Sequence, residues 1–390
     1  MSFLGHSADD LREKGAIHTA REIVQQPELW LKTYRTMVAA KEKARSFLEN
    51  VFANRELDVI LTGAGSSAFI GKALEGIVSK SFGKRVRAVP TTDIVTHPND
   101  YFVESNPTLL VSFARSGDSP ESVAAIEIAN RSLRQAYHLI ITCNRNGALA
   151  QTETGDSSRC LIVLPPEAND RGLAMTGSFT SMLLTGMLVA KLNAIERIQA
   201  EVELMASYGT RILENAPQFE TMAALDFERA VFLGSGPQLG TALESHLKVQ
   251  ELTDGNVICK HDSFLGFRHG PKAVVNQSTY LMFLLTNDPG VQPYEIDLIN
   301  ATGGAKGLFR FAVMERGVRN LHVDSVLELA KGDEHLPEEY LAVCNALPAQ
   351  ILGCLKSLRL GLRPDAPSAG GAIHRVVQGV TIYPYRSVAR

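Results

Sequence analysis

Two glycine- and serine-rich segments carry the groups that could bind a phosphate ester. The first, residues 63–67 (GAGSS), follows a short β-rich run, and the second, residues 115–119 (RSGDS), follows another. A glycine-rich turn between a strand and a helix leaves backbone N–H groups free at the helix N-terminus, where an anion is favoured. Serine hydroxyls add neutral donors, and a guanidinium group adds one fixed positive charge. The candidate phosphate ligands are Gly65, Ser66, Ser67, Arg115, Ser116 and Ser119.

Both segments are also compatible with roles that involve no phosphate ester. Residues 63–68 fit GxGxxA, which occurs in dinucleotide-binding turns, and such a turn can simply pack a helix against a sheet. The dinucleotide fingerprint requires an acidic residue about 20 positions further on, at the end of the next strand. Here residues 86–90 are followed only by Thr91-Thr92-Asp93, which disfavours a nicotinamide-dependent oxidoreductase. The serines can instead cap helices, and this role suits Ser119 best, because it directly precedes a proline.

A predicted helix over residues 238–252 carries three charged side chains on one face. Glu244, Lys248 and Glu251 are spaced i, i+4 and i+7, so they lie on the same side of the helix. From spacing alone, an ordinary solvated ladder of ion pairs is favoured over an acid–base site. Downstream, His269 stands in a turn just before Gly-Pro, and an isolated histidine of this kind is usually structural or solvated.

The rest of the sequence argues against several classes of protein. The chain has 390 residues and a net charge of −3, which is not the basic footprint of a nucleic-acid binder. Five cysteines without a CxxC motif favour a reduced, intracellular protein. The absence of HxH, HExxH and GxSxG motifs leads us to expect neither a metal site nor a nucleophile elbow, and no cofactor.

We also expect a cytoplasmic protein without a membrane partner. The first residues lack the basic and apolar regions of a signal peptide. The most apolar helix candidate, residues 178–190, is interrupted by polar residues and is too short for a bilayer, which takes about 20 apolar residues.

Apolar runs that alternate with helical stretches indicate the fold class. Runs of this kind predict parallel sheets covered on both faces. Residues 234–245 (GSGPQLGTALES) resemble residues 63–75 (GAGSSAFIGKALE), which indicates a weak internal repeat. We therefore predict an α/β protein with an N-terminal helical segment (1–50) and two doubly wound parallel-sheet domains (51–215, and 216–390 with a C-terminal tail). The predicted buried strands are residues 57–62, 109–113, 138–142, 160–164, 230–233 and 280–285.

Taken together, these motifs resemble those of the SIS (sugar isomerase) family of phosphosugar isomerases. The segments GAGSS, SFARSGDSPES, ESHLKVQEL and FRHGP occur in the family's order, and the resemblance covers most of residues 50–385. The layout is similar to the isomerase half of glucosamine-6-phosphate synthase. The segments SFARSGDSPES, FLGFRHGPK and RVVQGVTIYP resemble more closely the AgaS-type members, which are galactosamine-6-phosphate deaminases or tagatose-6-phosphate ketose/aldose isomerases. This resemblance implies two SIS domains.

The resemblance also implies a role for each candidate residue. The two serine-rich segments match the family's first and second phosphate-binding loops. Glu251 matches the glutamate that moves a proton between C1 and C2 of the sugar, and Lys248 matches a lysine beside the active site. His269 matches the histidine that helps to open the sugar ring and is often contributed by the partner subunit. We therefore expect a homodimer or a higher homo-oligomer with its active site at the subunit interface.

Three departures from the synthase pattern affect these expectations. Gln378 stands where the synthase has a lysine that helps ring opening, so it becomes a candidate substrate contact and ring opening rests on His269. Met175-Thr176 replace a Ser-Thr pair, which alters the contacts to the sugar and makes a different epimer plausible. The synthase's glutaminase domain is absent from this chain, so ammonia would be released to solution or taken from it.

The function implied is that of a deaminating isomerase. It would convert galactosamine 6-phosphate, a phosphorylated amino sugar, to tagatose 6-phosphate and ammonia. One alternative is a phosphosugar ketose/aldose isomerase that releases no amine. A second is a non-catalytic sugar-phosphate sensor, which would need neither Glu251 nor His269 and for which this chain lacks a basic helix-turn-helix segment.

Overall fold

The computed structural model describes residues 2–151, 157–302, 309–377 and 379–384. The chain divides into two compact units, each built from three stretches of sequence. Unit 1 comprises Met1–Leu31, Asp170–Thr180 and Arg197–Ala372, and unit 2 comprises Lys32–Asn169, Ser181–Glu196 and Ile373–Arg390. The boundaries predicted from the sequence, after residues 50 and 215, stay a prediction.

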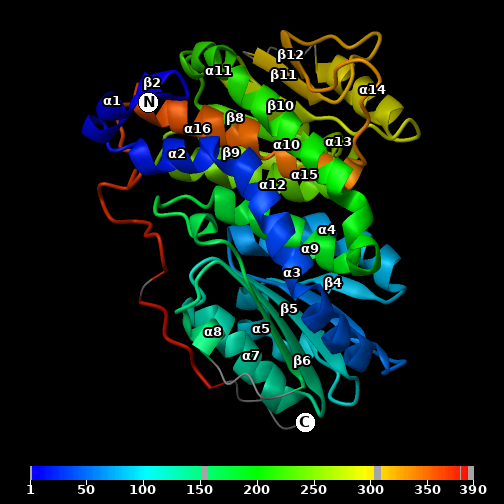
Figure 1. The fold of residues 1–390 in the computed structure, drawn as a ribbon. Helices are drawn as coiled ribbons and strands as arrows, with labels where there is room; N and C mark the ends of the chain where they lie inside the picture. Colours follow the sequence, from blue (N-terminus) through cyan, green and yellow to red (C-terminus); the bar gives the residue numbers. More distant parts are fainter. Residues whose placement is uncertain (1, 152–156, 303–308, 378, 385–390) are drawn as a thin grey trace. The chain divides into compact units, whose positions relative to one another are not determined.

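Unit 2 contains a five-stranded parallel sheet in the order β4-β3-β5-β6-β7 (Figure 1). Its side chains are apolar on both faces because helices cover both. Leu110 of β5 packs with Ile94 of α5 and Ile128 of α7 on one face. On the other face, Phe113 of β5 lies against α9 at Gly186. The elements are β3 (Asp58–Thr62), α4 (Ser66–Phe82), β4 (Val86–Ala88), α5 (Thr91–Thr96), α6 (Pro98–Tyr101), β5 (Thr108–Ala114), α7 (Pro120–Ser132), β6 (Ala136–Thr142), α8 (Ala148–Gln151), β7 (Arg159–Val163) and the 3-10 helix η1 (Pro166–Ala168).

Unit 1 contains a second parallel sheet, in the order β12-β11-β10-β8-β9. The N-terminal part of the chain is helical, as predicted, apart from a short two-stranded sheet. The elements are β1 (Ser2–Phe3), β2 (His6–Ser7), α1 (Ala8–Glu13), α2 (Ile17–Val24), α10 (Gln199–Glu214), α11 (Ala216–Ala223), β8 (Arg229–Gly234), α12 (Pro237–Leu252), β9 (Ile258–Asp262), α13 (Phe264–Phe267), η3 (Pro271–Val274), β10 (Thr279–Leu284), α14 (Gln292–Thr302), β11 (Phe309–Met314), β12 (Ser325–Glu328), α15 (Glu338–Cys344) and α16 (Leu347–Arg359).

Three further elements run across or beside the division between the units. They are α3 (Gln26–Phe52), α9 (Gly177–Ala190) and the 3-10 helix η2 (Leu192–Ile198).

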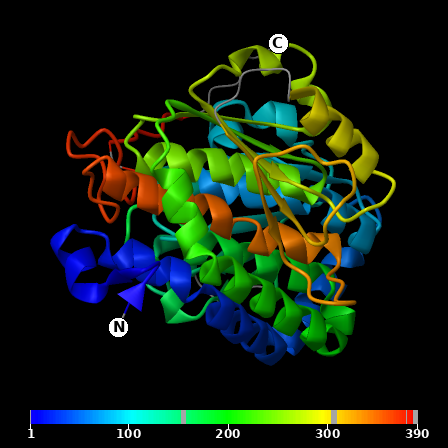
Figure 2. The ribbon, with the colours of Figure 1, turned by 90° about the horizontal axis from the view of Figure 1, so that it is seen from above.

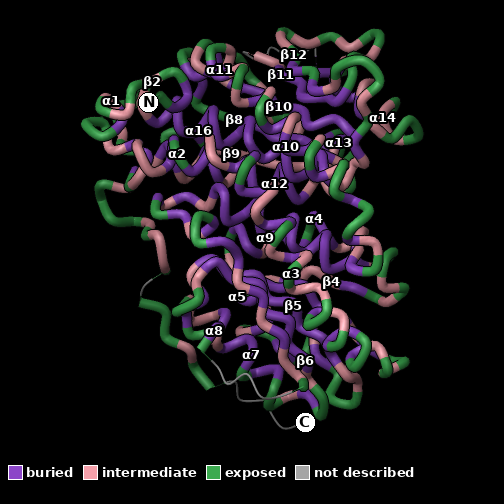
Figure 3. The backbone as a smooth tube through the Cα atoms, viewed as in Figure 1, coloured by how far each residue is buried: buried purple, intermediate pink, exposed green. Residues whose placement is uncertain are grey.

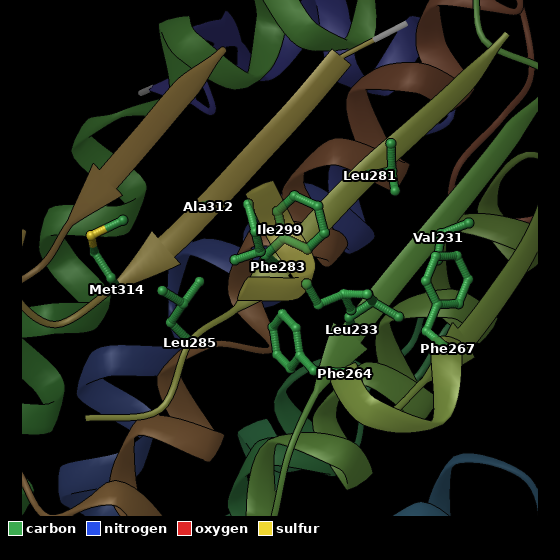
Figure 4. Packing of buried hydrophobic residues seen from close by; sticks show 11 residues of the cluster. Val231, Leu233, Phe264, Phe267, Leu281, Phe283, Leu285, Ile299, Ala312 and Met314 are labelled. Atoms are coloured by element: carbon green, nitrogen blue, oxygen red, sulfur yellow. The ribbon is translucent and has the colours of Figure 1, made fainter. Parts of the chain in front are cut away.

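The core of unit 1 explains the unbroken apolar run of β10. Phe283 on β10 lies beside Leu233 of β8 and Phe264 of α13 (Figure 4). Alternate residues point to the opposite face of the sheet. There the Tyr280 hydroxyl lies 3.1 Å from the Met222 sulfur of α11. Among the helices of unit 1, α12 packs against α16 (Figure 2). Burial on both faces is what the sequence pattern predicted for this strand, and Figure 3 shows the central strands β8 and β10 as largely buried.

The two sheets have the same topology. In each, the second strand in chain order lies outside the first, and the third, fourth and fifth follow on the other side. This is the flavodoxin-like order 2-1-3-4-5, whose switch point lies between the first and third strands. The predicted fold, an α/β protein with two doubly wound parallel sheets and an N-terminal helical segment, is confirmed.

Among the described residues, one helical stretch, residues 338–359, is long enough and apolar enough to cross a membrane, judged by length and composition alone. The stretch contains α15 and α16, and 94% of it is buried inside the protein, as is usual for a core helix. A second candidate arises only if residues 177–190 and 192–214, which are bent by 114°, are counted together.

The tight turns after β3 and β8 generate a prediction on stability. A Cβ at Gly63 would lie 2.6 Å from the carbonyl carbon of Ser67, and one at Gly234 would lie 2.6 Å from that of Gln238. Neither backbone can move aside easily, so Gly63→Ala and Gly234→Ala should each lower the free energy of unfolding by about 1–3 kcal/mol. The measurement is urea-induced unfolding.

Gly76→Ala is the matched control, because a Cβ at this exposed position of α4 would meet nothing within 4 Å. It should raise the stability by about 0.5–1 kcal/mol, as expected for glycine to alanine inside a helix. Equal effects for all three variants would contradict the steric argument.

Candidate active site

The first predicted phosphate loop lies at the N-terminus of α4 in unit 2. Gly65 is the N-cap and has φ 55° and ψ −129°, a backbone conformation that residues other than glycine rarely adopt. Ser66 and Ser67 follow in the first turn, and both are buried. The helix has 17 residues, so its N-terminal amides and dipole favour an anion at this end.

The second predicted phosphate loop lies between β5 and α7. Gly117 has φ 71°, which turns the chain sharply between Ser116 and the helix. The Ser116 Oγ accepts a hydrogen bond from the backbone N–H of Asp118 at 3.2 Å. Ser119 is the N-cap of α7, but its side chain caps no backbone amide and instead donates to the Ser122 Oγ at 2.6 Å. Side-chain capping therefore does not account for Ser119.

The register of the sheet brings the two loops to neighbouring strand ends. β3 and β5 are parallel and adjacent, with Thr62 opposite Ser112, so the loops that follow these two strands leave the sheet at the same edge. This is the switch point of the sheet, where ligands bind in open α/β folds. The two loops thus lie at adjacent strand ends, while their contact with a phosphate stays a prediction.

Arg115 connects the second loop to the C-terminal tail within unit 2. Its guanidinium group is buried and donates a hydrogen bond to the backbone carbonyl of Arg375. The Arg375 Nη2 in turn donates to the Asn169 Oδ1 at 2.8 Å. Arg375 and Asn169 were not predicted from the sequence, because they are far from Arg115 and from each other along the chain and belong to no motif. Gln378, the predicted tail contact, lies outside the described residues.

The three charged residues on α12 form a buried ion-pair group in unit 1. The Lys248 Nζ lies 2.6 Å from the Glu251 Oε2 and 3.4 Å from the Glu244 Oε1. The side chains of Lys248 and Glu244 are each 1% exposed, whereas that of Glu251 is 24% exposed. The solvated ladder that spacing alone favoured is therefore wrong for Glu244 and Lys248, because helix packing buries this face of α12. The arrangement fixes Glu251 in place and leaves its carboxylate partly open.

His269 lies in the turn that follows α13, also in unit 1. Its backbone N–H donates to the carbonyl of Gly266 at 3.0 Å, and the residue is exposed. The next residue, Gly270, has φ 108° and redirects the chain into η3. The structure thus presents this histidine on the surface of its own chain, and its contribution to a partner's site stays a prediction.

The described residues offer no group for a metal ion. No three His, Cys, Asp or Glu side chains come together to hold one within residues 2–151, 157–302, 309–377 and 379–384.

Comparison with known proteins relates the chain to one family along nearly its whole length. Residues 51–192 match the family model of the SIS domain. The AgaS protein of Streptomyces coelicolor is 42% identical over 376 residues, which are 95% of this chain and 96% of that protein. The D-galactosamine-6-phosphate deaminase AgaS of Escherichia coli is 36% identical over 95% of this chain and 96% of its own length. The crystal structure of tagatose-6-phosphate ketose/aldose isomerase from Escherichia coli is similar with a TM-score of 0.87 and 35% identity, covering 95% of this chain and 97% of that one.

The ion-pair group on α12 generates a prediction on stability. Lys248→Met removes the ammonium group that lies between two carboxylates, one of them buried. Loss of one partner from a buried ion pair leaves a buried charge without its counter-ion, so the free energy of unfolding should fall by about 3 kcal/mol. Urea-induced unfolding measures this change.

Lys260→Met is the matched control. This lysine pairs with Asp262 at 3.7 Å, and its side chain is 38% exposed, so its loss should change stability by no more than about 1 kcal/mol. If the two substitutions destabilise the protein equally, the buried group is not the stabilising one.

Proposed function

The chain belongs to the SIS family and, within it, to the AgaS group, and on this basis we propose that it converts galactosamine 6-phosphate and water to tagatose 6-phosphate and ammonia. The AgaS relative of Escherichia coli carries the name of D-galactosamine-6-phosphate deaminase and aligns over 95% of this chain. The observation that carries the proposal is the Lys248–Glu251 pair, because it supplies a fixed and partly exposed carboxylate of the kind that proton transfer requires.

The phosphate group of the substrate is assigned to the two loops at the switch point of unit 2. Ser66, Ser67, Ser116 and Ser119 supply hydroxyl groups, and Gly65 allows the backbone amides at the start of α4 to face an anion. Arg115 supplies the positive charge and holds the tail at Arg375. Binding a group that does not react allows the enzyme to position the carbons that do. Gln378 is the proposed further contact from the tail.

Proton transfer between C2 and C1 is assigned to Glu251. His269 assists opening of the sugar ring, which exposes the C1 aldehyde. The Glu251 carboxylate then removes the C2 proton, the electrons form the C1–C2 double bond of an enolamine, and the C1=O π bond opens as its oxygen takes a proton from water. Return of the proton from Glu251 to C1, with loss of an N–H proton to water, gives an imine at C2. Water adds to this imine, the C–N bond breaks, and ammonia leaves behind the ketone of tagatose 6-phosphate.

Lys248 supports this step as a positioning residue. Its ammonium group lies 2.6 Å from the Glu251 carboxylate and donates a hydrogen bond to it, which holds the carboxylate in one orientation. Glu244 holds the other side of the same ammonium group. We further infer a cytoplasmic homodimer in which each subunit offers its exposed His269 to the active site of the other.

A second candidate function is isomerisation without loss of the amine. The similar structure from Escherichia coli carries the name of tagatose-6-phosphate ketose/aldose isomerase. The same carboxylate would then act on a substrate with a hydroxyl group at C2, through an enediol in place of the enolamine.

Ammonia release from galactosamine 6-phosphate tests the proposed function. The purified protein should release ammonia and an equal amount of ketose phosphate from this substrate. Glucosamine 6-phosphate and N-acetylgalactosamine 6-phosphate serve as comparators, and both should react more slowly. Failure to release ammonia from any of them, together with conversion of tagatose 6-phosphate to its aldose, would establish the second candidate instead.

Glu251→Gln tests the assignment of the proton carrier. An amide cannot accept the C2 proton, so kcat should fall by at least about 100-fold, the lower range for loss of a general base. The Kd for the phosphosugar should change little, because the phosphate is assigned to residues of other elements. Steady-state kinetics and isothermal titration calorimetry measure the two quantities.

Glu203→Gln is the matched control, an exposed glutamate on α10 whose loss should leave kcat unchanged. A variant Glu251→Gln that loses binding but keeps its kcat would assign Glu251 to binding and not to proton transfer.

A further inference from the structure

The second sheet repeats the backbone geometry of the first phosphate loop. Gly236, the N-cap of α12, has φ 54° and ψ −128°, and Gly65, the N-cap of α4, has φ 55° and ψ −129°. Two residues earlier, Gly63 and Gly234 approach the first helical turn equally closely. Both turns follow the first strand of a sheet with the order 2-1-3-4-5. Unit 1 thus contains a turn with the same form as the one that we assign to phosphate in unit 2.

The strand register shows which residues correspond in the second loop. In unit 1, Gly234 pairs with Leu284 of β10. In unit 2, Thr62 pairs with Ser112, so Gly63 falls beside Phe113. Leu284 therefore corresponds to Phe113, and two residues further along the chain Thr286 corresponds to Arg115. The loop that follows β10 therefore begins at the same point of the switch-point crevice as the loop that follows β5.

A carboxyl group from α14 fills this crevice in unit 1. The Glu295 Oε2 accepts a hydrogen bond from the backbone N–H of Thr286 at 2.9 Å, and the side chain of Ser235 in the first loop also interacts with this carboxyl group. Glu295 is fully buried. Glu295 lies nine residues after Thr286. The residue nine positions after Arg115 in unit 2 is Ala124, which has no polar group that could reach the loops.

Two neighbouring groups complete the crevice. The Thr286 hydroxyl donates to the Glu338 Oε1 of α15, which brings a second carboxyl group to the same threonine. Gln238 takes the place of Ser67 in the first turn of α12. It is fully buried, and among the described residues neither its Oε1 nor its Nε2 has a hydrogen-bond partner.

The burial of Glu295 is consistent with a group that replaces a ligand. Burial raises the pKa of Glu295 to about 8, and the hydrogen bonds from Thr286 and Ser235 only partly oppose this effect. Its Oε1 is buried and finds no hydrogen-bond partner in the part of the chain that the structure describes. A buried carboxyl group costs stability unless hydrogen bonds compensate it, and here the Thr286 N–H and the Ser235 side chain supply only part of that compensation.

We propose that unit 1 contains a second phosphate cradle, formed by Ser235, the N-terminus of α12 and Thr286, which the chain closes with the side chain of Glu295. The proposal rests on the phosphate role assigned to the equivalent loops of unit 2. On this proposal, only the turn of unit 2 is open to a phosphate group. The ligand class of the opened cradle is a phosphate or another tetrahedral oxyanion.

Glu295→Ala tests the proposal by removing the carboxyl group that meets the loops. Titration of the full chain with inorganic phosphate in a calorimeter should show one more binding site per chain than in the wild type. Glu295→Ala/Glu338→Gln should show the same gain with a lower Kd, because the glutamine still accepts from the Thr286 hydroxyl but carries no negative charge. Glu295→Gln, which keeps the crevice filled, is the control and should gain no site.

Thermal unfolding provides the second measurement. Both alanine variants should have a lower Tm in chloride, and phosphate at equal ionic strength should raise it more than it raises that of the wild type, since a ligand stabilises the folded state that binds it. A variant that unfolds in chloride should refold in phosphate. The proposal is overturned if folded Glu295→Ala gains no site, if Glu295→Gln gains one equally, or if phosphate rescues neither alanine variant.

These outcomes are separate from a failure of the proposed function. The readout is the difference between variant and wild type, so it holds whether the wild type binds one phosphate or none. A chain that releases no ammonia but gains a phosphate site in Glu295→Ala would refute the deaminase assignment alone. A chain that releases ammonia but gains no site would refute the second cradle alone.

Discussion

The close approach between the end of a strand and the first turn of the next helix constrains much of this structure. At Gly63 and at Gly234 a Cβ would lie 2.6 Å from a carbonyl carbon of the following helix, so only glycine allows the chain to turn this tightly. The N-cap glycines then adopt nearly identical positive φ angles. This turn sets the direction in which α4 and α12 leave their sheets, and it determines where their N-terminal amides and their first side chains point. The predicted phosphate loop and the helix that carries Glu251 both depend on it.

The two repeats share a backbone but differ in the chemistry of their side chains. In unit 2 the switch point holds serines and one arginine, which suit an anion. In unit 1 the equivalent loops instead meet two carboxyl groups, of which Glu295 is fully buried and accepts a hydrogen bond from the loop. The candidate catalytic residues of unit 1, Lys248 and Glu251, lie further along α12 and form an ion pair.

Burial determines how strongly the ion pairs on α12 restrain their side chains. An exposed ion pair contributes little to stability and fixes no geometry, whereas a buried one restrains both partners. Lys248 and Glu244 are buried and Glu251 is only partly so, which gives this group one open carboxylate. In unit 2, Arg115 restrains the C-terminal tail in a comparable way, because it donates a hydrogen bond to the backbone carbonyl of Arg375.

The sequence by itself determined the fold class, the six predicted strands and the family, because strand runs and loop motifs are local patterns. The spacing of Glu244, Lys248 and Glu251 placed them on one helix face, but only the packing of α12 decided that this face is buried. The contact between Arg115 and Arg375 joins residues 260 positions apart, and the fit of Glu295 into the second crevice depends on the register between β8 and β10. Such contacts arise from the way elements pack, and no local pattern encodes them, so only the tertiary structure could reveal them.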